Sequence, residues 1–317
     1  MIVIPALHPA YDLILGLDTV RIGTIHRVAP GATAHGVGGK SVNVALDVAR
    51  MGAPVRLIVL ADERLADAIG AIAAGLPDLE LVAIPSPVVS RTDLAIVTPD
   101  ALTVINATAA DPGTEAVARV HAATIQGLST NDVLVLAGST PAGTERAHAA
   151  IAAAATSRGV RTIVDADGPA LAALLAIGPS AVKVASAEAE RLGDPTQARD
   201  PRTSTTALGS MAQRPTGLGD VPIVGITEGP SGLRAWLPAG RTVRVVPPTD
   251  VRVVSPLGAG DAVTAGLAIA LARGDDPLDG LILGTAMAAS TLGHLDASVE
   301  PGVVDAYRTG VRVIDLA

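Results

Sequence analysis

Short runs of β-branched residues alternate with alanine-rich stretches of helical length along the second half of the chain. VLVLAG (133–138) precedes an alanine-rich segment at 145–157, RTIVDAD (161–167) precedes PALAALLAIG, and AVKVAS (181–186) precedes AEAERLG. Strands that are buried on both faces have continuous apolar sequences, and a helical crossover makes the next strand parallel. The alternation therefore predicts an α/β fold, a doubly wound and mainly parallel sheet flanked by helices.

The rest of the second half contains a predicted hairpin and a final strand and helix. RAWLP and TVRVVPP are separated by Ala239 and Gly240, which is typical of a β-hairpin. VRVVSP (251–256) is predicted as a strand that leads into a helix over DAVTAGLAIALARG, and Gly274 ends this helix. Residues 193–220 are rich in Gly, Pro, Ser and Thr, which predicts a surface excursion with one short helix.

The first 110 residues follow a different pattern. After a strand at IVIPAL come four short apolar segments, DLILGL, TIHRVA, RTDLAIVT and ALTVINA, with one strong helix at 40–51. Parallel strands need a helix between them, so five short strands with one helix cannot all belong to the parallel sheet. We therefore predict a small β-sheet that projects from the main domain as a lid. The lid strands are expected within 10–35 and 86–108.

Composition excludes several classes of protein. The 317 residues include no cysteine, which rules out disulfides, a thiol nucleophile and cysteine-ligated zinc. A net charge of −8 and an aromatic content of 1% argue against a surface that binds nucleic acid, and only two of the 23 basic residues are lysines. No apolar stretch is long enough to span a bilayer and no secretory signal follows Met1, so we expect a cytoplasmic protein.

SPLGAGDAVTAG (255–266) carries the strongest chemical signal in the chain. Gly258, Ala259 and Gly260 are small enough for backbone N–H groups to approach an anion, and the helix that follows adds the partial positive charge of its N-terminus. This combination predicts an anion hole for a phosphate group. Asp261 either interacts with the helix dipole or, beside a bound phosphate, accepts the proton of an attacking hydroxyl as a general base.

A second glycine-rich turn, in HGVGGKSVNVALDVARMG (35–52), precedes a predicted helix. A Walker A loop would need glycine where the chain has Ala34, so a P-loop is not expected. The glycines either form an ordinary turn before the helix or bring the backbone close to a small polar ligand. In the second case Lys40 and Asn43, one helical turn apart, both reach the ligand.

Several polar residues are weighed as further candidates. Asp12 follows the first strand and either caps a turn or accepts hydrogen bonds from ligand hydroxyls. Arg27 and Arg91 lie in the predicted lid strands, where a guanidinium suits bidentate binding of a phosphate. Asp165 and Asp167 are assigned to turn structure, and a hydrolase that uses them as a carboxylate pair is the weaker alternative.

Taken in order, the motifs resemble those of the ribokinase-like (PfkB) family of carbohydrate kinases. The similar branch contains 1-phosphofructokinase, the minor type of 6-phosphofructokinase and tagatose-6-phosphate kinase. The resemblance runs nearly end to end and implies one ribokinase-like kinase domain over 1–317. HPAYD (8–12) is similar to NPALD, GGKSVNVA (38–45) to GGKGINVA, SRTDLAI (90–96) to an RTN stretch, INATAADPG (105–113) to NEPGP, AGSTPAGT (137–144) to SGSLPPGV, VDADGPAL (164–171) to VDSSGEAL, and VVSPLGAGDAVTAG (253–266) to the GAGD signature.

The resemblance implies an ATP-dependent transfer of the γ-phosphoryl group to a hydroxyl of a phosphorylated ketohexose. Fructose 1-phosphate, fructose 6-phosphate and tagatose 6-phosphate are the candidate acceptors. Mg²⁺ would bridge the nucleotide phosphates, and lid strands that pair between subunits would form a homodimer. Asp261 would be the general base, and the backbone of Gly258, Ala259 and Gly260 would hold the γ-phosphate.

The resemblance also implies two sets of binding residues. Sugar hydroxyls would be bound by Asp12, Gly38, Gly39 and Asn43, and the phosphate on the sugar by Lys40, Arg27 and Arg91. The nucleotide would be bound by Lys183, Glu188, Thr227, Gly229, Gly258 and Gly260, with Glu188 also acting on the metal through water.

Two departures from the family pattern leave alternatives open. VKVASAEAE stands where the branch has KPNxxE, so Val184 and Ala185 replace Pro and Asn, and Mg²⁺ handling is weakened unless Ser186 substitutes. RTN has become RTD, which places Asp93 near the presumed sugar phosphate, where a carboxylate repels a dianion. The alternatives are a kinase for an unphosphorylated sugar or nucleoside, and a ligand-binding homologue that is impaired in turnover.

Overall fold

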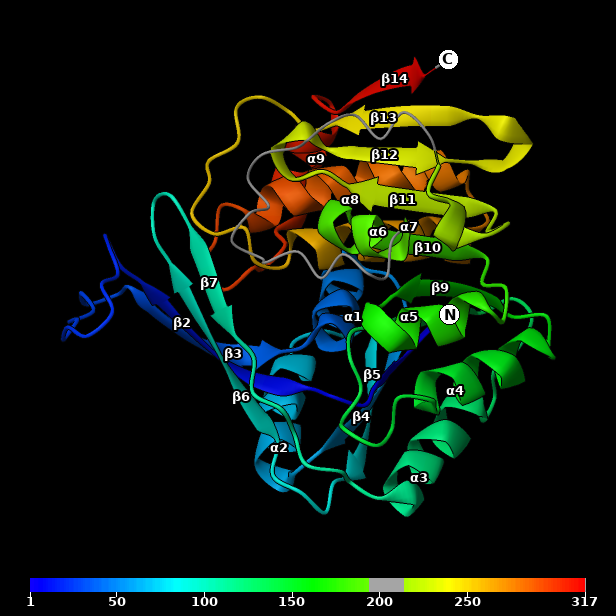
Figure 1. Ribbon diagram of the computed structural model, residues 1–317, viewed down its shortest axis with the longest axis horizontal. Helices are drawn as coiled ribbons and strands as arrows, with labels where there is room; N and C mark the ends of the chain where they lie inside the picture. Colours follow the sequence, from blue (N-terminus) through cyan, green and yellow to red (C-terminus); the bar gives the residue numbers. More distant parts are fainter. Residues whose placement is uncertain (194–213, 317) are drawn as a thin grey trace.

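The computed structural model describes residues 1–193 and 214–316, which form two sheets with helices packed around the larger one (Figure 1). In this part of the chain the larger sheet has ten strands in the order β14-β13-β12-β11-β10-β9-β8-β1-β4-β5. The smaller sheet has four strands in the order β3-β2-β6-β7. The surface excursion predicted over 193–220 lies mostly outside the described residues, and at its end a short 3₁₀-helix, η2, spans Thr216–Leu218.

Seven neighbouring strands of the large sheet are parallel, and three strands at one edge are antiparallel. The predicted hairpin is confirmed, because Leu233 pairs with Val245 and Trp236 with Thr242. The parallel strands are β1 (Ile2–Ala6), β4 (Val55–Ala61), β5 (Leu79–Pro85), β8 (Val133–Ala137), β9 (Arg161–Asp165), β10 (Ala181–Ala185) and β11 (Ile223–Thr227). The antiparallel strands are β12 (Leu233–Trp236), β13 (Thr242–Val246) and β14 (Arg312–Leu316).

Helices cover both faces of this sheet and bury two separate apolar clusters. This arrangement confirms the predicted doubly wound α/β fold. One face carries α1 (Lys40–Arg50), α2 (Glu63–Ala73), α7 (Ala259–Arg273), α8 (Pro277–Thr291) and α9 (Pro301–Arg308). The other face carries α3 (Thr114–Ile125), α4 (Ala147–Thr156), α5 (Gly168–Leu175) and α6 (Ser186–Gly193). Two further 3₁₀-helices, η3 (Gly229–Ser231) and η4 (Pro238–Gly240), lie in loops of the antiparallel edge.

The small sheet projects from the N-terminal part of the large one, at the left of Figure 1. It consists of β2 (Ala10–Gly16), β3 (Thr33–Gly38), β6 (Arg91–Val97) and β7 (Leu102–Ile105), and it buries a small apolar cluster of its own. β1 runs almost directly into β2, and β5 into β6, so short connections join the two sheets. This confirms the prediction of a small separate sheet from the N-terminal third.

Two strand predictions for the flanking regions were wrong, and so was the expectation of a single helix in the N-terminal third. TIHRVA (24–29) is part of a loop, because its Ile25 is 85% exposed and no strand pairs with it, and the strand lies instead at β3. VRVVSP (251–256) is also irregular, with Val253 65% exposed. The N-terminal third is not limited to one helix, since β4, α2 and β5 add a complete strand–helix–strand unit to the large sheet.

α7 and α8 form the closest helix pair of the fold, and glycines make this approach possible. A Cβ atom at Gly266 would collide with the backbone of Gly284, and one at Gly280 would lie 2.9 Å from Cα of Leu267. α7 ends before Gly274, as predicted, but it begins at Ala259 rather than at Asp261. In the described part of the chain no helix has both the length and the apolar character to cross a membrane.

His148 on α4 is fully buried, and neither ring nitrogen has a hydrogen-bond partner. Burial lowers the pKa of its imidazole from 6.5 to about 4. The unfolded chain therefore binds a proton at pH values where the folded chain does not, and stability falls as the pH drops from about 6.5 toward 4. We expect His148→Leu to raise the melting temperature more at pH 5 than at pH 8. Equal shifts at both pH values would contradict a neutral, unpaired His148.

Candidate active site

A cavity of about 450 Å³ lies between the carboxyl ends of the central strands and the small sheet. Its walls come from the ends of β1 and β8, the start of α1, strand β6, the segment after β7 and the N-terminus of α7. In open α/β sheets this edge is where ligands bind. The predicted site residues that line the cavity are Asp12, Gly39, Lys40, Asn43, Arg91, Gly258 and Asp261.

The N-terminus of α7 forms one end of the cavity. Gly258 adopts a left-handed conformation with φ 72°, and a Cβ atom there would lie 2.7 Å from Cβ of Ala297, so the position requires glycine. The helix starts at Ala259, which directs the first free N–H groups of α7 toward the cavity side of the turn. The local geometry therefore provides the backbone donors that an anion hole needs.

Asp261 lies in the first turn of α7, faces the cavity and is 7% exposed. Nδ2 of Asn43 on α1 donates a hydrogen bond to its Oδ2 at 2.8 Å. Burial, and then the negative charge of Asp165, raise the pKa of Asp261 to about 6, while Lys183 and Lys40 oppose this rise. A carboxylate with a pKa near neutrality and an orientation fixed by an amide suits a general base.

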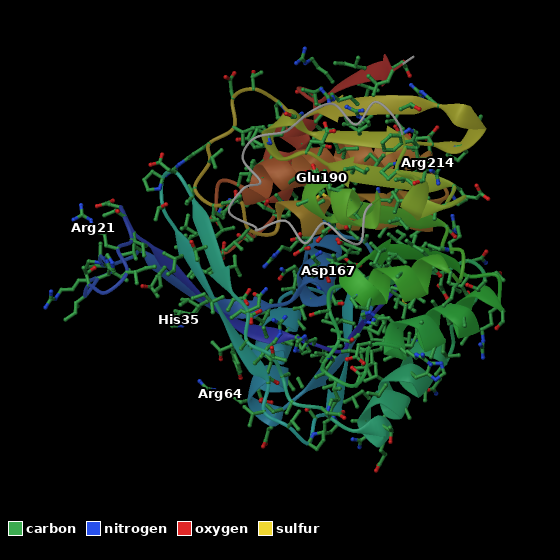
Figure 2. All side chains as sticks on the ribbon, viewed as in Figure 1. Arg21, His35, Arg64, Asp167, Glu190 and Arg214 are labelled. Atoms are coloured by element: carbon green, nitrogen blue, oxygen red, sulfur yellow. The ribbon has the colours of Figure 1, made fainter. Side chains whose placement is uncertain are left out.

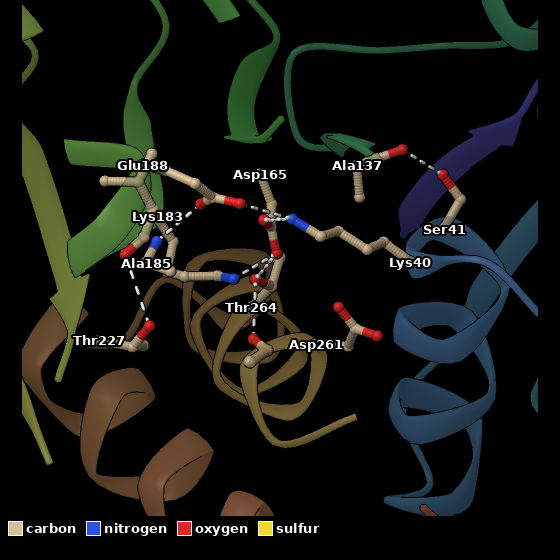
Figure 3. A network of polar contacts seen from close by, with 12 residues as sticks. Lys40, Ser41, Ala137, Asp165, Lys183, Ala185, Glu188, Thr227, Asp261 and Thr264 are labelled. Atoms are coloured by element: carbon tan, nitrogen blue, oxygen red, sulfur yellow. Dashed lines mark hydrogen bonds and ion pairs between the residues drawn. The ribbon is translucent and has the colours of Figure 1, made fainter. Parts of the chain in front are cut away.

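Asp165, at the end of β9, is the centre of a buried ionic network near Asp261 (Figure 3). Its Oδ1 lies 3.1 Å from Nζ of Lys40, and its Oδ2 lies 2.7 Å from Nζ of Lys183. Oγ1 of Thr264, one turn after Asp261 on α7, donates to Oδ2 at 2.7 Å. The only two lysines of the sequence thus share one carboxylate, and their charges hold the pKa of Asp165 at about 2 despite complete burial.

Lys183 also lies against the N-terminus of α7. A Cβ atom at Gly260 would lie 3.2 Å from its Nζ, so the ammonium group packs directly against the first turn of α7. Lys183 is 3% exposed, and it therefore places a fixed positive charge behind the free N–H groups of the helix. The positive charge of Lys183 and the positive end of the helix dipole therefore lie at the same place.

Lys40 does not point freely into the cavity. Besides its contact with Asp165, its Nζ lies 3.5 Å from Oε1 of Glu188 on α6. Glu188 is fixed in turn because its Oε2 accepts a hydrogen bond from the backbone N–H of Ala185 at 2.7 Å. Lys40 thus links the cavity to Glu188, one of the residues predicted to bind the nucleotide.

The opposite end of the cavity, under the small sheet, is formed by Arg91, Asp93 and His8. Nη1 of Arg91 lies 2.6 Å from Oδ2 of Asp93, and its Nε and Nη2 donate to the backbone oxygen of His8. The backbone N–H of Ala109 donates to Nε2 of His8, so Nδ1 carries the proton and donates to Oγ of Ser139. Burial, and then Arg91, lower the pKa of His8 to about 4, which keeps this ring neutral.

Asp12 on β2 also lines this end. Burial, followed by the charge of Asp93, raises the pKa of Asp12 to about 6. Gly38, on the neighbouring strand β3, leaves the space for this carboxylate, because a Cβ atom at Gly38 would overlap Oδ2 of Asp12.

Eight predicted site residues do not line this cavity: Arg27, Gly38, Ala259, Gly260, Lys183, Glu188, Thr227 and Gly229. Arg27 is exposed in the loop between β2 and β3, whose Arg21 lies far from the large sheet in Figure 2. Thr227 ends β11, where its Oγ1 donates weakly to the backbone oxygen of Val184 at 3.5 Å, and Gly229 begins η3. Thr227 pairs with Ala185, which directly precedes the helix of Glu188.

Sequence reasoning missed Asp165, which it assigned to turn structure, and it missed Thr264. Asp165 is instead fully buried and carries two ion pairs. The composition contained a signal for these partners of Asp165. Nearly all basic residues of the chain are arginines, and the only lysines of the sequence are Lys40 and Lys183. An ammonium group is more compact than a guanidinium, so two of them fit around one buried carboxylate.

Comparisons with known proteins agree with this geometry. A profile described as pfkB family carbohydrate kinase matches residues 86–301. The chain is 33% identical to the 1-phosphofructokinase of Rhodobacter capsulatus over 308 residues, which cover 93% of this chain and 92% of that protein.

Solved structures share the fold. Phosphofructokinase-2 from Escherichia coli, in complex with substrates and products, has a TM-score of 0.82 at 21% identity and covers 98% of both chains. The nucleoside kinase of Burkholderia thailandensis, in complex with inosine, has a TM-score of 0.70 at 18% identity and also covers 98% of both chains. The predicted resemblance and the predicted phosphotransferase class are confirmed, and the chain belongs to the pfkB family of carbohydrate kinases.

Proposed function

We propose that this protein transfers the γ-phosphoryl group of ATP to a hydroxyl group of a sugar, with Asp261 as the general base. The observation that carries the proposal is the position of Asp261. Its carboxylate is buried, oriented by Asn43 and open to the cavity, in the first turn of the helix that offers free N–H groups. A hydroxyl bound beside it loses its proton to Asp261 as its oxygen attacks the phosphorus atom.

The anion hole is proposed to consist of the backbone at Gly258, Ala259 and Gly260. These N–H groups, the helix dipole and the Lys183 ammonium group would stabilise the negative charge on the transferred phosphoryl group. Because all three are fixed before the substrate binds, they need no reorganisation during the reaction. The nucleotide is proposed to extend from there past Glu188 toward Thr227 and Gly229.

The residues present fit Mg²⁺ as a partner of the nucleotide rather than as a resident of a protein cage. Within residues 1–193 and 214–316 no group of three or more His, Asp or Glu side chains could hold a metal ion. Mg²⁺ binds through one or two carboxylates, water and substrate phosphates, and Glu188 offers such a carboxylate. Bound there, the ion would neutralise charge on the nucleotide phosphates.

The acceptor is proposed to be either a phosphorylated ketohexose or an unphosphorylated sugar or nucleoside. The name of the Rhodobacter capsulatus relative supports the first. The Asp93 carboxylate in the cavity supports the second. In both cases Asp12, Gly39 and Asn43 are the proposed partners of the sugar hydroxyls.

We propose that the chain acts as one kinase domain over 1–317, with the small sheet as a lid, and that two copies form a homodimer through these lids. Exposed apolar side chains on the lid support this assembly: Ile22 and Ile25 in the loop after β2 are 102% and 85% exposed, and Ile105 on β7 is 56% exposed.

Release of ADP from Mg-ATP, measured with a coupled assay, tests the proposed function. The acceptors are fructose 1-phosphate, fructose 6-phosphate, tagatose 6-phosphate, free hexoses, ribose and nucleosides. We expect acceptor-dependent ADP release with at least one of them. ATP binding without turnover on any acceptor would favour the ligand-binding homologue, and Ala185→Asn would then show whether the nucleotide side is the cause.

A further inference from the structure

The lining of the cavity carries more carboxylates than cations. His8 does not add positive charge, because its Nε2 accepts a hydrogen bond and its pKa is lowered to about 4. With the acids ionised, the titratable groups of the lining have a net charge of −2. The acids are Asp12, Asp93, Asp167 and Asp261, and the bases are Lys40 and Arg91.

Both cations are already engaged by the protein itself. Lys40 is shared between Asp165 and Glu188, as Figure 3 shows. Arg91 pairs with Asp93 through Nη1, and its other two nitrogens donate to the backbone oxygen of His8. A phosphate group on the acceptor would have to displace a carboxylate that the structure holds in place.

Asp93 cannot easily turn away from Arg91. Its Oδ1 accepts a hydrogen bond from the backbone N–H of Ala107 at 3.0 Å, and its Oδ2 contacts Arg91. The side chain is 11% exposed, so repulsion between this carboxylate and a phosphate dianion would be only weakly screened by water. A carboxylate accepts hydrogen bonds from sugar hydroxyls, whereas an ionised phosphate offers it no donor.

We infer that Asp93 selects an acceptor that carries no phosphate group, that is, a neutral sugar or nucleoside. The inference rests on the proposed kinase function and names its substrate class. Asp93 acts by occupying Arg91 and by repelling a second anion. It is therefore a specificity-determining residue rather than part of the phosphoryl-transfer machinery.

The test compares each neutral acceptor with its own phosphorylated form, for example fructose with fructose 1-phosphate and fructose 6-phosphate. We expect the wild-type protein to have the higher kcat/KM for the neutral member of the pair. Asp93→Asn keeps an oxygen for the N–H of Ala107 and releases Arg91. We expect it to shift the ratio of kcat/KM toward the phosphorylated acceptor by about tenfold or more, as close charge pairs allow.

Asp167→Asn is the matched control. Asp167 lines the same cavity and is exposed, and the substitution removes one charge without touching Arg91. We expect this variant to change the ratio far less than Asp93→Asn. Equal shifts in the two variants would show that only the net charge matters and would overturn the assigned role of Asp93.

A binding measurement separates this inference from the proposed function. Binding of inorganic phosphate is measured by calorimetric titration. We expect phosphate to bind Asp93→Asn about tenfold more tightly than the wild-type protein or Asp167→Asn. A wild-type preference for phosphorylated acceptors, or no gain of phosphate binding in Asp93→Asn, would overturn the inference. Absence of turnover on every acceptor would instead contradict the proposed function, and the phosphate titration would still decide the role of Asp93.

Discussion

Asp261→Asn is expected to lower kcat by about 10³-fold, within the range that a lost general base accounts for. An asparagine at this position keeps an oxygen for the hydrogen bond from Asn43 but cannot take the proton of the acceptor hydroxyl. The affinity for the acceptor should change little, because the cavity keeps its shape. The measurement is steady-state ADP release by the variant and the wild-type protein, with acceptor binding followed separately.

The stability of Asp261→Asn shows whether a lower kcat comes from the loss of the general base or from unfolding. Burial raises the pKa of Asp261 to about 6, so above that pH the folded protein carries an ionised carboxylate that its surroundings disfavour. Removing this charge should leave the melting temperature at pH 8 unchanged or raise it. A fall in kcat that came with a large loss of stability would not support a role as general base.

The pH dependence of kcat follows from the same group. A general base works in its deprotonated form, so kcat of the wild-type protein should rise as the pH increases through about 6 and then level off. The low-pH limb of the profile should be absent from the residual activity of Asp261→Asn.

Asp165→Asn is expected to lower the free energy of unfolding by about 3–5 kcal/mol, the usual cost of removing one partner from a buried ion pair. The substitution leaves Lys183 buried without a counter-charge and takes from Lys40 the closer of its two partners. Chemical denaturation at pH 7 measures the effect. Asp167→Asn, two residues further along the chain and exposed, should stay near the wild-type value.

The contribution of Asp165 to the stability of the fold should also disappear at acidic pH. Its two lysines hold its pKa at about 2, below the usual 3.8. A lowered pKa means that the carboxylate stabilises the fold fully above pH 3.8, and that this stability is lost as the pH falls from 3.8 toward 2. The difference in stability between the wild-type protein and Asp165→Asn should therefore narrow over that interval. A constant difference would contradict the ion pairs with Lys40 and Lys183.

The large sheet could be predicted because buried parallel strands have a local signature. VLVLAG and AVKVAS are continuous apolar runs that precede helical segments, and β8 and β10 occupy those positions. TIHRVA and VRVVSP have similar compositions, but they are loops. Whether an apolar run pairs with another strand depends on partners that lie elsewhere in the chain, which composition alone does not give.

The candidate site was predictable to a similar degree. GAGD and GGK lie next to helix starts, and their chemistry follows from that position. The network around Asp165 was not predictable in the same way, because two of its three partners are far away in the sequence, Lys40 by 125 residues and Thr264 by 99. Only the folded sheet brings these side chains to one carboxylate, and turn propensity at VDADG gives no sign of it.

The most direct test of the central claim is ³¹P NMR of the protein with Mg-ATP and the acceptor that releases ADP fastest. Phosphoryl transfer to a sugar hydroxyl predicts equal growth of the ADP signals and of one new phosphate-ester signal, both slowed about 10³-fold in Asp261→Asn. Growth of ADP together with free inorganic phosphate, and without a new ester, would show hydrolysis of ATP and would contradict a sugar kinase.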